Sequence, residues 1–208
     1  MGKQHSIQLA FDFAAVERDF VLTRPLSRHR SRDALVRKLH YVRRFFPELD
    51  GQTIRVGLTR TASGLAIPGG VELWVHPSQT SYHTLAHEFI HLLQGKHGIP
   101  TGERSCDIYA LARHWTLNDS PPYYVKLPAE FRTSSGNIRP EYAKLIWTTA
   151  RRAVEMRQAG TRNYISYFEK TLERHGPSPR RPRRAPSRPS ASALAALTDE
   201  GASRRPRS

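Results

Sequence analysis

Hydrophobic residues recur at helical spacing along much of the chain. The clearest case is residues 31–46, a predicted helix that Ser31 can cap and that Pro47 ends. Its apolar side is formed by Leu35, Leu39, Val42 and Phe46. The other predicted helices are residues 81–94, residues 101–113, a long helix that opens at Pro140, and residues 164–174.

Two short stretches in front of residue 81 are predicted to be strands. Residues 53–59 alternate between apolar and polar positions, and residues 71–76 form a second apolar stretch that ends at Pro77. A small sheet therefore precedes the helix at residues 81–94, and the part that follows it is helical. The predicted fold class is α+β.

The composition divides the chain of 208 residues into three parts. Residues 1–30 show no clear pattern, whereas residues 31–175 are long enough to bury a core and are expected to form one domain. Residues 176–208 are rich in proline, arginine and serine, and only Leu194 and Leu197 are large and apolar there. We expect this last part to be a disordered basic tail.

The helix predicted at residues 81–94 contains His87-Glu88-Phe89-Ile90-His91, which is the pattern H-E-x-x-H. Helical positions four apart lie about 40° apart around the axis and about 6 Å apart along it, so His87 and His91 can share a metal ion. Imidazoles suit Zn2+, which lowers the pKa of bound water to about 7, and Glu88 can reach that water. The alternative is a core helix whose histidines only make hydrogen bonds.

A catalytic zinc site needs a third protein ligand. Glu103 and Asp107 form the pattern E-x-x-x-D, which places both carboxylates on one side of the next predicted helix. H-E-x-x-H followed by E-x-x-x-D resembles the gluzincin metallopeptidases, and the resemblance covers mainly residues 81–113. It implies a reduced zincin-like fold in which Glu103 is the third ligand and Asp107 hydrogen-bonds the far ring nitrogen of His87.

The third ligand has alternatives. The loop between the two helices is short, which puts Glu103 in the first turn of its helix, so Asp107, one turn further in, is the alternative ligand. His97 has the spacing of the metzincin third histidine, although Gln94 stands where that family has glycine. The chain also resembles SprT-like proteases, which act on DNA-bound proteins and take a third histidine in the region that Cys106 and Asp107 occupy here.

The resemblance also suggests where a substrate would lie. In zincin proteases the strand before the metal helix often forms the sheet edge that pairs with an extended peptide. Residues 71–76 are the candidate, and an ordinary internal strand is the alternative. Candidates for a hydrogen-bond donor to the oxyanion are Tyr123, Tyr124 and His114. His83 lies about 12 Å from His91 along the helix, too far to share one ion.

The net charge of +15 suggests a polyanionic partner or an acidic substrate. Eight arginines and two acidic residues lie in residues 176–208, which could contact nucleic acid at low affinity. The polar side of the helix at residues 31–46 could add a phosphate-facing stripe. It carries Arg37, Lys38, Arg43 and Arg44. In both segments the alternative is a solvated surface.

The predicted function is zinc-dependent hydrolysis of peptide bonds, with a protein or peptide as substrate and Glu88 as general base. The alternatives are an SprT-like protease that acts on DNA-bound proteins and a non-catalytic zinc domain that binds nucleic acid or a protein partner. No apolar run is long enough to span a membrane, and no secretory signal is visible. Because Cys106 is the single cysteine, we expect a cytoplasmic protein.

Overall fold

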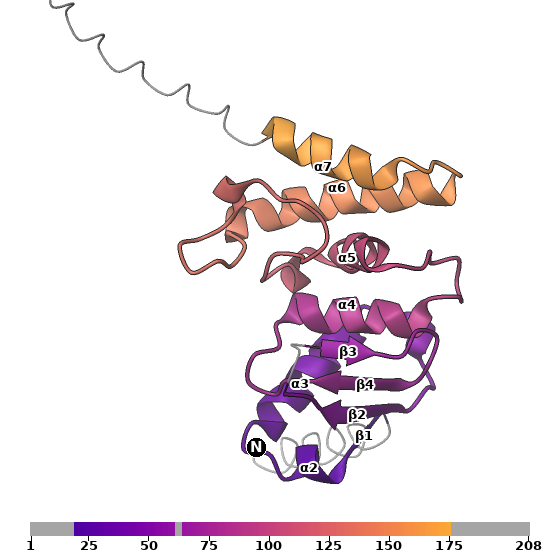
Figure 1. The fold of residues 1–208 in the computed structure, drawn as a ribbon, viewed down its shortest axis with the longest axis vertical. Coiled ribbons are helices and arrows are strands. Elements are labelled where there is room, and N and C mark those ends of the chain that lie inside the picture. Colours follow the sequence, from indigo (N-terminus) through magenta and orange to yellow (C-terminus); the bar gives the residue numbers. More distant parts are fainter. Residues whose placement is uncertain (1–18, 61–63, 176–208) are drawn as a thin grey trace, which may run out of the picture. The chain divides into compact units, whose positions relative to one another are not determined.

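The computed structural model describes residues 19–60 and 64–175, which form an α+β fold around a small mixed sheet (Figure 1). In the described residues the sheet has four strands in the order β1-β2-β4-β3. Strand β2 pairs in parallel with β1 and with β4, and β3 pairs antiparallel with β4. The strands are β1 (Phe20–Leu22), β2 (Ile54–Leu58), β3 (Gly64–Ala66) and β4 (Glu72–Val75).

The sheet differs from the expectation at both of its edges. Strand β4 corresponds to the stretch expected at the sheet edge, but it lies between β2 and β3, so the alternative of an internal strand is correct. The edge is β3, in which Gly64 stands opposite Val75 of β4. At the other side β1 pairs with β2, so the folded unit begins before residue 31.

The expected helices are confirmed, each within a few residues of its predicted bounds. Ser81 caps the helix that carries the histidines, because its hydroxyl accepts a hydrogen bond from the backbone N–H of Thr84. The carboxylate of Asp119 accepts two more, from the backbone N–H groups of Tyr82 and His83. The helices are α2 (Arg24–Ser27), α3 (Arg32–Arg43), α4 (Tyr82–Leu93), α5 (Glu103–Leu111), α6 (Pro140–Gln158) and α7 (Tyr164–His175).

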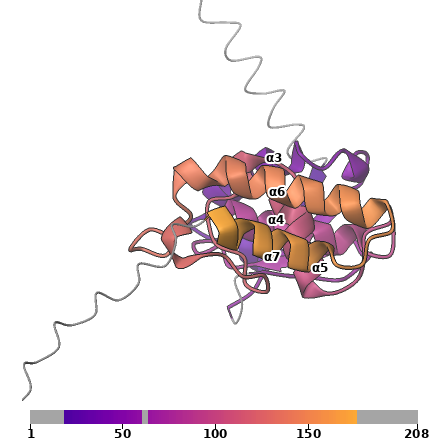
Figure 2. The ribbon, with the colours of Figure 1, turned by 90° about the horizontal axis from the view of Figure 1, so that it is seen from above.

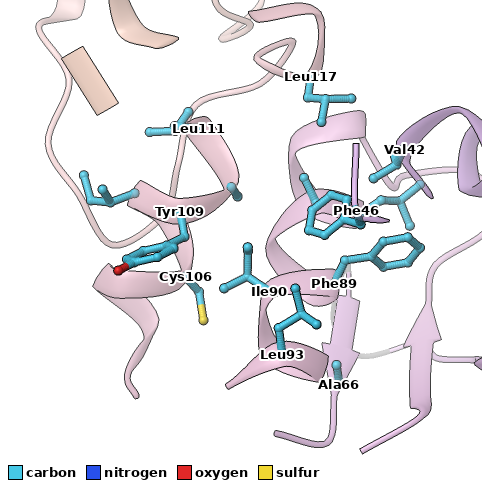
Figure 3. Close-up of a cluster of buried hydrophobic side chains, with 14 of the residues drawn as sticks. Val42, Phe46, Ala66, Phe89, Ile90, Leu93, Cys106, Tyr109, Leu111 and Leu117 are labelled. Carbon is cyan, nitrogen blue, oxygen red and sulfur yellow. The ribbon is translucent and has the colours of Figure 1, made fainter. Parts of the chain in front are cut away.

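Helix α4 lies between the sheet and helices α5, α6 and α7. Figure 1 shows it next to β3, with α5, α6 and α7 successively further from the sheet, and Figure 2 shows α6 and α7 side by side. Phe89 packs edge-to-face on Phe46 at 5.2 Å between ring centroids. Ile90 extends from the same helix toward Cys106 of α5 (Figure 3). Because both sides of α4 pack against core residues, the polar residues that it carries are held in fixed positions.

Backbone contacts divide the chain into two units, Met1–Gly176 and Pro177–Ser208. The second unit lies outside the described residues, as does most of the segment 1–30, so the expected disordered tail stays a prediction. Among the helices of the described residues, none has the length and apolar character needed to cross a membrane.

Candidate metal centre

Three ligand atoms from α4 and α5 converge on one point. His87 Nε2 lies 3.1 Å from His91 Nε2 and 3.0 Å from Glu103 Oε2, and His91 Nε2 lies 3.3 Å from the same oxygen. In a tetrahedral zinc site with bonds of about 2.0–2.1 Å, neighbouring ligand atoms are about 3.4 Å apart. The three atoms are therefore spaced like three corners of such a site.

Both histidines make a hydrogen bond through their other ring nitrogen. His87 Nδ1 lies 2.8 Å from Asp107 Oδ1, and His91 Nδ1 lies 2.8 Å from Gln94 Oε1. Each Nδ1 donates to its oxygen, so a neutral ring presents a bare Nε2 lone pair. Two lone pairs and the Glu103 oxygen repel one another unless a cation lies between them, so this set of donors fits a metal ion.

The acidic surroundings favour positive charge at this point. Burial by itself would lower the pKa of His87, but the hydrogen bond and negative charge of Asp107, together with Glu88 and Glu103, raise the pKa above its usual value. In the metal-free protein a proton can therefore take the place of a metal ion. Metal binding would then release that proton.

Asp107 lies on the opposite side of the His87 ring from Glu103. Its side chain is fully buried, and its Oδ2 accepts hydrogen bonds from the backbone N–H groups of Tyr124 at 2.6 Å and Val125 at 3.2 Å. Burial acts to raise the pKa of Asp107, but the hydrogen bond with His87 and the charges of His83 and His87 hold it well below its usual range. Asp107 is thus a charged anchor for His87 and for the loop at Tyr124.

Glu88 lies between the ligand atoms and the edge strand. A Cβ atom on Gly64 would come within 2.5 Å of Glu88 Oε1, so the absence of a side chain allows β3 to pass this close. Burial raises the pKa of Glu88 to about 7. Its Oε2 has no hydrogen-bond partner in the described part of the chain. Glu88 therefore has an oxygen available to accept a proton beside the candidate metal centre.

The candidate metal centre opens into a cavity of about 490 Å³. Helix α4, strand β3 and the segment with Tyr123 and Tyr124 all contribute to its lining. The lining residues are Gly64, Leu65, Ala66, Pro68, His83, Thr84, His87, Glu88, His91, Glu103, Tyr123 and Tyr124. A larger cavity of about 590 Å³ shares Tyr123 with it but includes none of the ligand side chains. The candidate ligands and Glu88 therefore line the smaller of these two cavities.

Two other groups in the described residues could hold a metal ion, namely His87 with His91 and Cys106, and His83 with His87 and Asp107. Cys106 lies 3.4 Å from His91 Nδ1, the nitrogen that also faces Gln94, and burial and nearby carboxylates raise the pKa of its thiol. Asp107 is already bonded to His87 Nδ1. The group with Glu103 is the one that leaves the outer hydrogen bonds of both rings intact.

Of the other residues predicted to belong to the site, the two tyrosines line the cavity and the two histidines do not. His97 is exposed and lines a different cavity with Glu48 and Arg113, so the structure does not bring it to the candidate metal centre. His114 stacks on Phe45 at 4.6 Å, away from the cavity. Tyr123 and Tyr124 do line the cavity, and the ring of Tyr124 stacks on His87 at 5.9 Å between centroids.

His83 is buried one turn before His87. Its Nε2 lies 3.5 Å from Asp107 Oδ1, and neither ring nitrogen makes a hydrogen bond to another described residue. His83 lines the same cavity as the ligands, although it faces the Asp107 side rather than the point where the three ligand atoms meet.

Two features of the site had no clear sequence signal. In the sequence Gln94 stands out only as a residue in place of a glycine, yet its side chain bonds His91. Gly64 follows a stretch with no alternating pattern, and its importance depends on the pairing of β3 with β4. An amide three residues after a metal-ligand histidine, at the end of the helix, is the signal that could have identified Gln94.

Comparisons with known proteins give no match for this chain. No family model, no curated protein and no solved structure matches it.

Proposed function

We propose that the protein is a zinc-dependent metallopeptidase with a zincin-like active site. The observation that carries the proposal is the convergence of His87 Nε2, His91 Nε2 and Glu103 Oε2 within 3.3 Å of one another. Two imidazoles and one carboxylate are a ligand set found in catalytic zinc sites, which keep a fourth position for water or substrate.

The described side chains have separate roles in this proposal. His87, His91 and Glu103 would hold the ion, and Asp107 and Gln94 would fix the two rings. Lewis-acid polarisation of the scissile carbonyl and activation of water are the chemistry that bound zinc supplies. Glu88 would accept the proton of the attacking water and pass it to the leaving amine. Tyr123 and Tyr124 are the candidates for hydrogen bonding to the oxyanion.

Strand β3 supports a peptide as the substrate. It is an edge strand that borders the cavity, so its outer backbone groups can pair with an extended peptide. Gly64, the first residue of β3, lies beside Glu88. A peptide paired with β3 would therefore cross the cavity next to the general base, which is the position that hydrolysis of its backbone requires.

The test is cleavage of a mixed peptide library by the purified protein. We expect zinc-dependent cleavage that a chelator abolishes and that added zinc restores, because the proposed mechanism has no other electrophile. Products would be identified by mass spectrometry. Zinc-loaded protein that cleaves neither library peptides nor unfolded proteins would contradict a general peptidase and favour the non-catalytic zinc domain.

A nucleic-acid partner, as in the SprT-like alternative, is supported by the distribution of charge. Residues 24–44 hold eight basic side chains and one acidic side chain. Arg24, Arg28, Arg37 and Arg44 are exposed among them. The stripe predicted on helix α3 is smaller than expected, since Arg43 is buried and donates to the Leu49 carbonyl. We call the exposed arginines Arg24, Arg28, Arg37 and Arg44 together the α2–α3 basic surface.

We expect glutamine substitutions at Arg24, Arg28 and Arg37 to weaken binding to duplex DNA and to reduce its salt dependence. An arginine that no longer neutralises a phosphate makes the slope of log K against log salt shallower by about 0.9. Fluorescence anisotropy over a range of salt concentrations measures both quantities. The control replaces the same number of exposed arginines elsewhere, at Arg139, Arg152 and Arg162. Equal slopes for the two triple variants would exclude the α2–α3 basic surface as a specific DNA contact.

A further inference from the structure

The amide of Gln94 connects the second candidate ligand to the loop that leads to the third. Its side chain is buried, with 4% of the residue exposed. Its Oε1 lies 2.8 Å from His91 Nδ1, and its Nε2 donates to the Pro100 carbonyl at 3.0 Å. The Gly102 carbonyl lies 3.5 Å from the same nitrogen. One amide thus spans the end of α4 and the start of α5.

The chemistry of the neighbours fixes the orientation of this amide. Backbone carbonyls only accept hydrogen bonds, so the NH2 group must face Pro100 and Gly102. The oxygen is then left for His91, whose Nδ1 must carry the hydrogen. That tautomer is the one that presents the His91 Nε2 lone pair toward His87 and Glu103. Both ends of the amide are therefore needed, each for a different partner.

The loop that the amide holds has a few other contacts, namely the buried side chain of Ile99 and the hydrogen bond from Lys96 to the Gly69 carbonyl, and its backbone is glycine-rich. Four of its residues have a positive φ angle, which are Gly95, His97, Gly98 and Gly102, at 73°, 54°, 69° and 99°. Glycine-rich backbone of this kind has many accessible conformations. Glu103 is the first residue of α5, directly after this loop, and its side chain is 46% exposed. Packing alone therefore constrains the third ligand weakly.

We propose that Gln94 is a positioning residue that sets the distance between the second and third metal ligands. It would do so by orienting the His91 ring and by clamping residues 100–102, so that Glu103 enters the site at the correct point. This inference rests on the proposed zinc site. It adds that the α4–α5 connection is part of the metal site, although no residue between Gln94 and Glu103 contacts the point where the ligand atoms meet.

Two variants separate the two ends of the amide. Gln94→Leu removes both hydrogen-bonding ends, and we expect it to weaken zinc binding by about 10–100-fold, as loss of a group behind a metal ligand does. Gln94→Glu keeps an oxygen for His91 but places a carboxylate against two carbonyls, which would release the loop. In metal-free protein we expect both variants to speed hydrogen exchange of the backbone amides of residues 103–106.

The decisive comparison repeats the zinc measurement in a Glu103→Ala background. If Gln94 acts partly through the loop, Gln94→Leu reduces zinc affinity by a clearly smaller factor in the Glu103→Ala background than in the native protein. The variant with both Gln94→Leu and Glu103→Ala should bind zinc weakly, so its binding curve is measured up to high zinc concentration. Gln52→Leu is the matched control, because the Gln52 amide donates to the Glu48 carbonyl, away from the site. This variant should change neither zinc binding nor exchange of residues 103–106.

The zinc-affinity and hydrogen-exchange measurements can each contradict the proposed role of Gln94. Equal losses of zinc affinity for Gln94→Leu in the two backgrounds would overturn the proposal that Gln94 holds residues 100–102 in place. Unchanged hydrogen exchange in residues 103–106 would do the same. If Gln94→Leu does not fold, Gln94→Glu decides the question, because its loss of affinity should disappear in the Glu103→Ala background. Absence of zinc binding by the native protein would refute the proposed function, whereas the exchange comparison in metal-free protein would still test Gln94.

Discussion

Replacing Glu88 by glutamine is expected to abolish most peptide hydrolysis while the protein keeps its zinc. Glutamine has the same shape but cannot accept the proton of the attacking water, and general-base catalysis contributes about 10²–10⁴-fold. Zinc should stay because Glu88 is not one of the three side chains whose ligand atoms converge. Zinc content and initial rates of peptide cleavage, measured on the same preparation, check both parts.

The control for this variant is Glu130→Gln, which changes an exposed carboxylate away from the cavity. It should retain full activity. A Glu88→Gln protein with at least a tenth of the native rate would exclude Glu88 as the general base. If the native protein and the Glu88→Gln variant both bind zinc and neither cleaves peptides, the non-catalytic zinc domain becomes the better explanation.

Sequence patterns were sufficient for the long elements and insufficient for the sheet edges. Helices α3, α4 and α6 have apolar positions that repeat over several turns, so their periodicity was visible. Strands β1 and β3 have three residues each, too few to show alternation. Their existence depends on pairing with β2 and β4. The residue next to Glu88, Gly64, belongs to such a strand and could not be predicted locally.

The same distinction between local patterns and tertiary pairing holds within the candidate metal site. His87, Glu88 and His91 were predicted by spacing within one helix. Their relation to Glu103 depends on how the loop of residues 95–102 folds, and its positive φ angles are set by tertiary contacts as well as by glycine. The sequence therefore could not choose between Glu103 and Asp107 as the third ligand. In the structure Glu103 contacts the Nε2 side of His87 and Asp107 contacts the Nδ1 side.

The zinc contents of Glu103→Ala and Asp107→Asn should therefore differ. Glu103→Ala removes one of three converging ligand atoms, and we expect zinc affinity to fall by more than about 100-fold, beyond the effect of losing a group behind a ligand. Asp107→Asn keeps the volume of the side chain but loses the charge that fixes His87, so a weakening of about 10–100-fold is expected.

Zinc per chain after dialysis, followed by competition with a chelator of known affinity, measures both variants. Thermal unfolding of the metal-free proteins is needed beside it, because Asp107 also accepts hydrogen bonds from the backbone of Tyr124 and Val125. If Asp107→Asn folds normally and loses zinc while Glu103→Ala keeps it, the third ligand lies one turn further along α5. Glu103 would then be an exposed carboxylate at the rim of the cavity, and the proposed ligand set would be wrong.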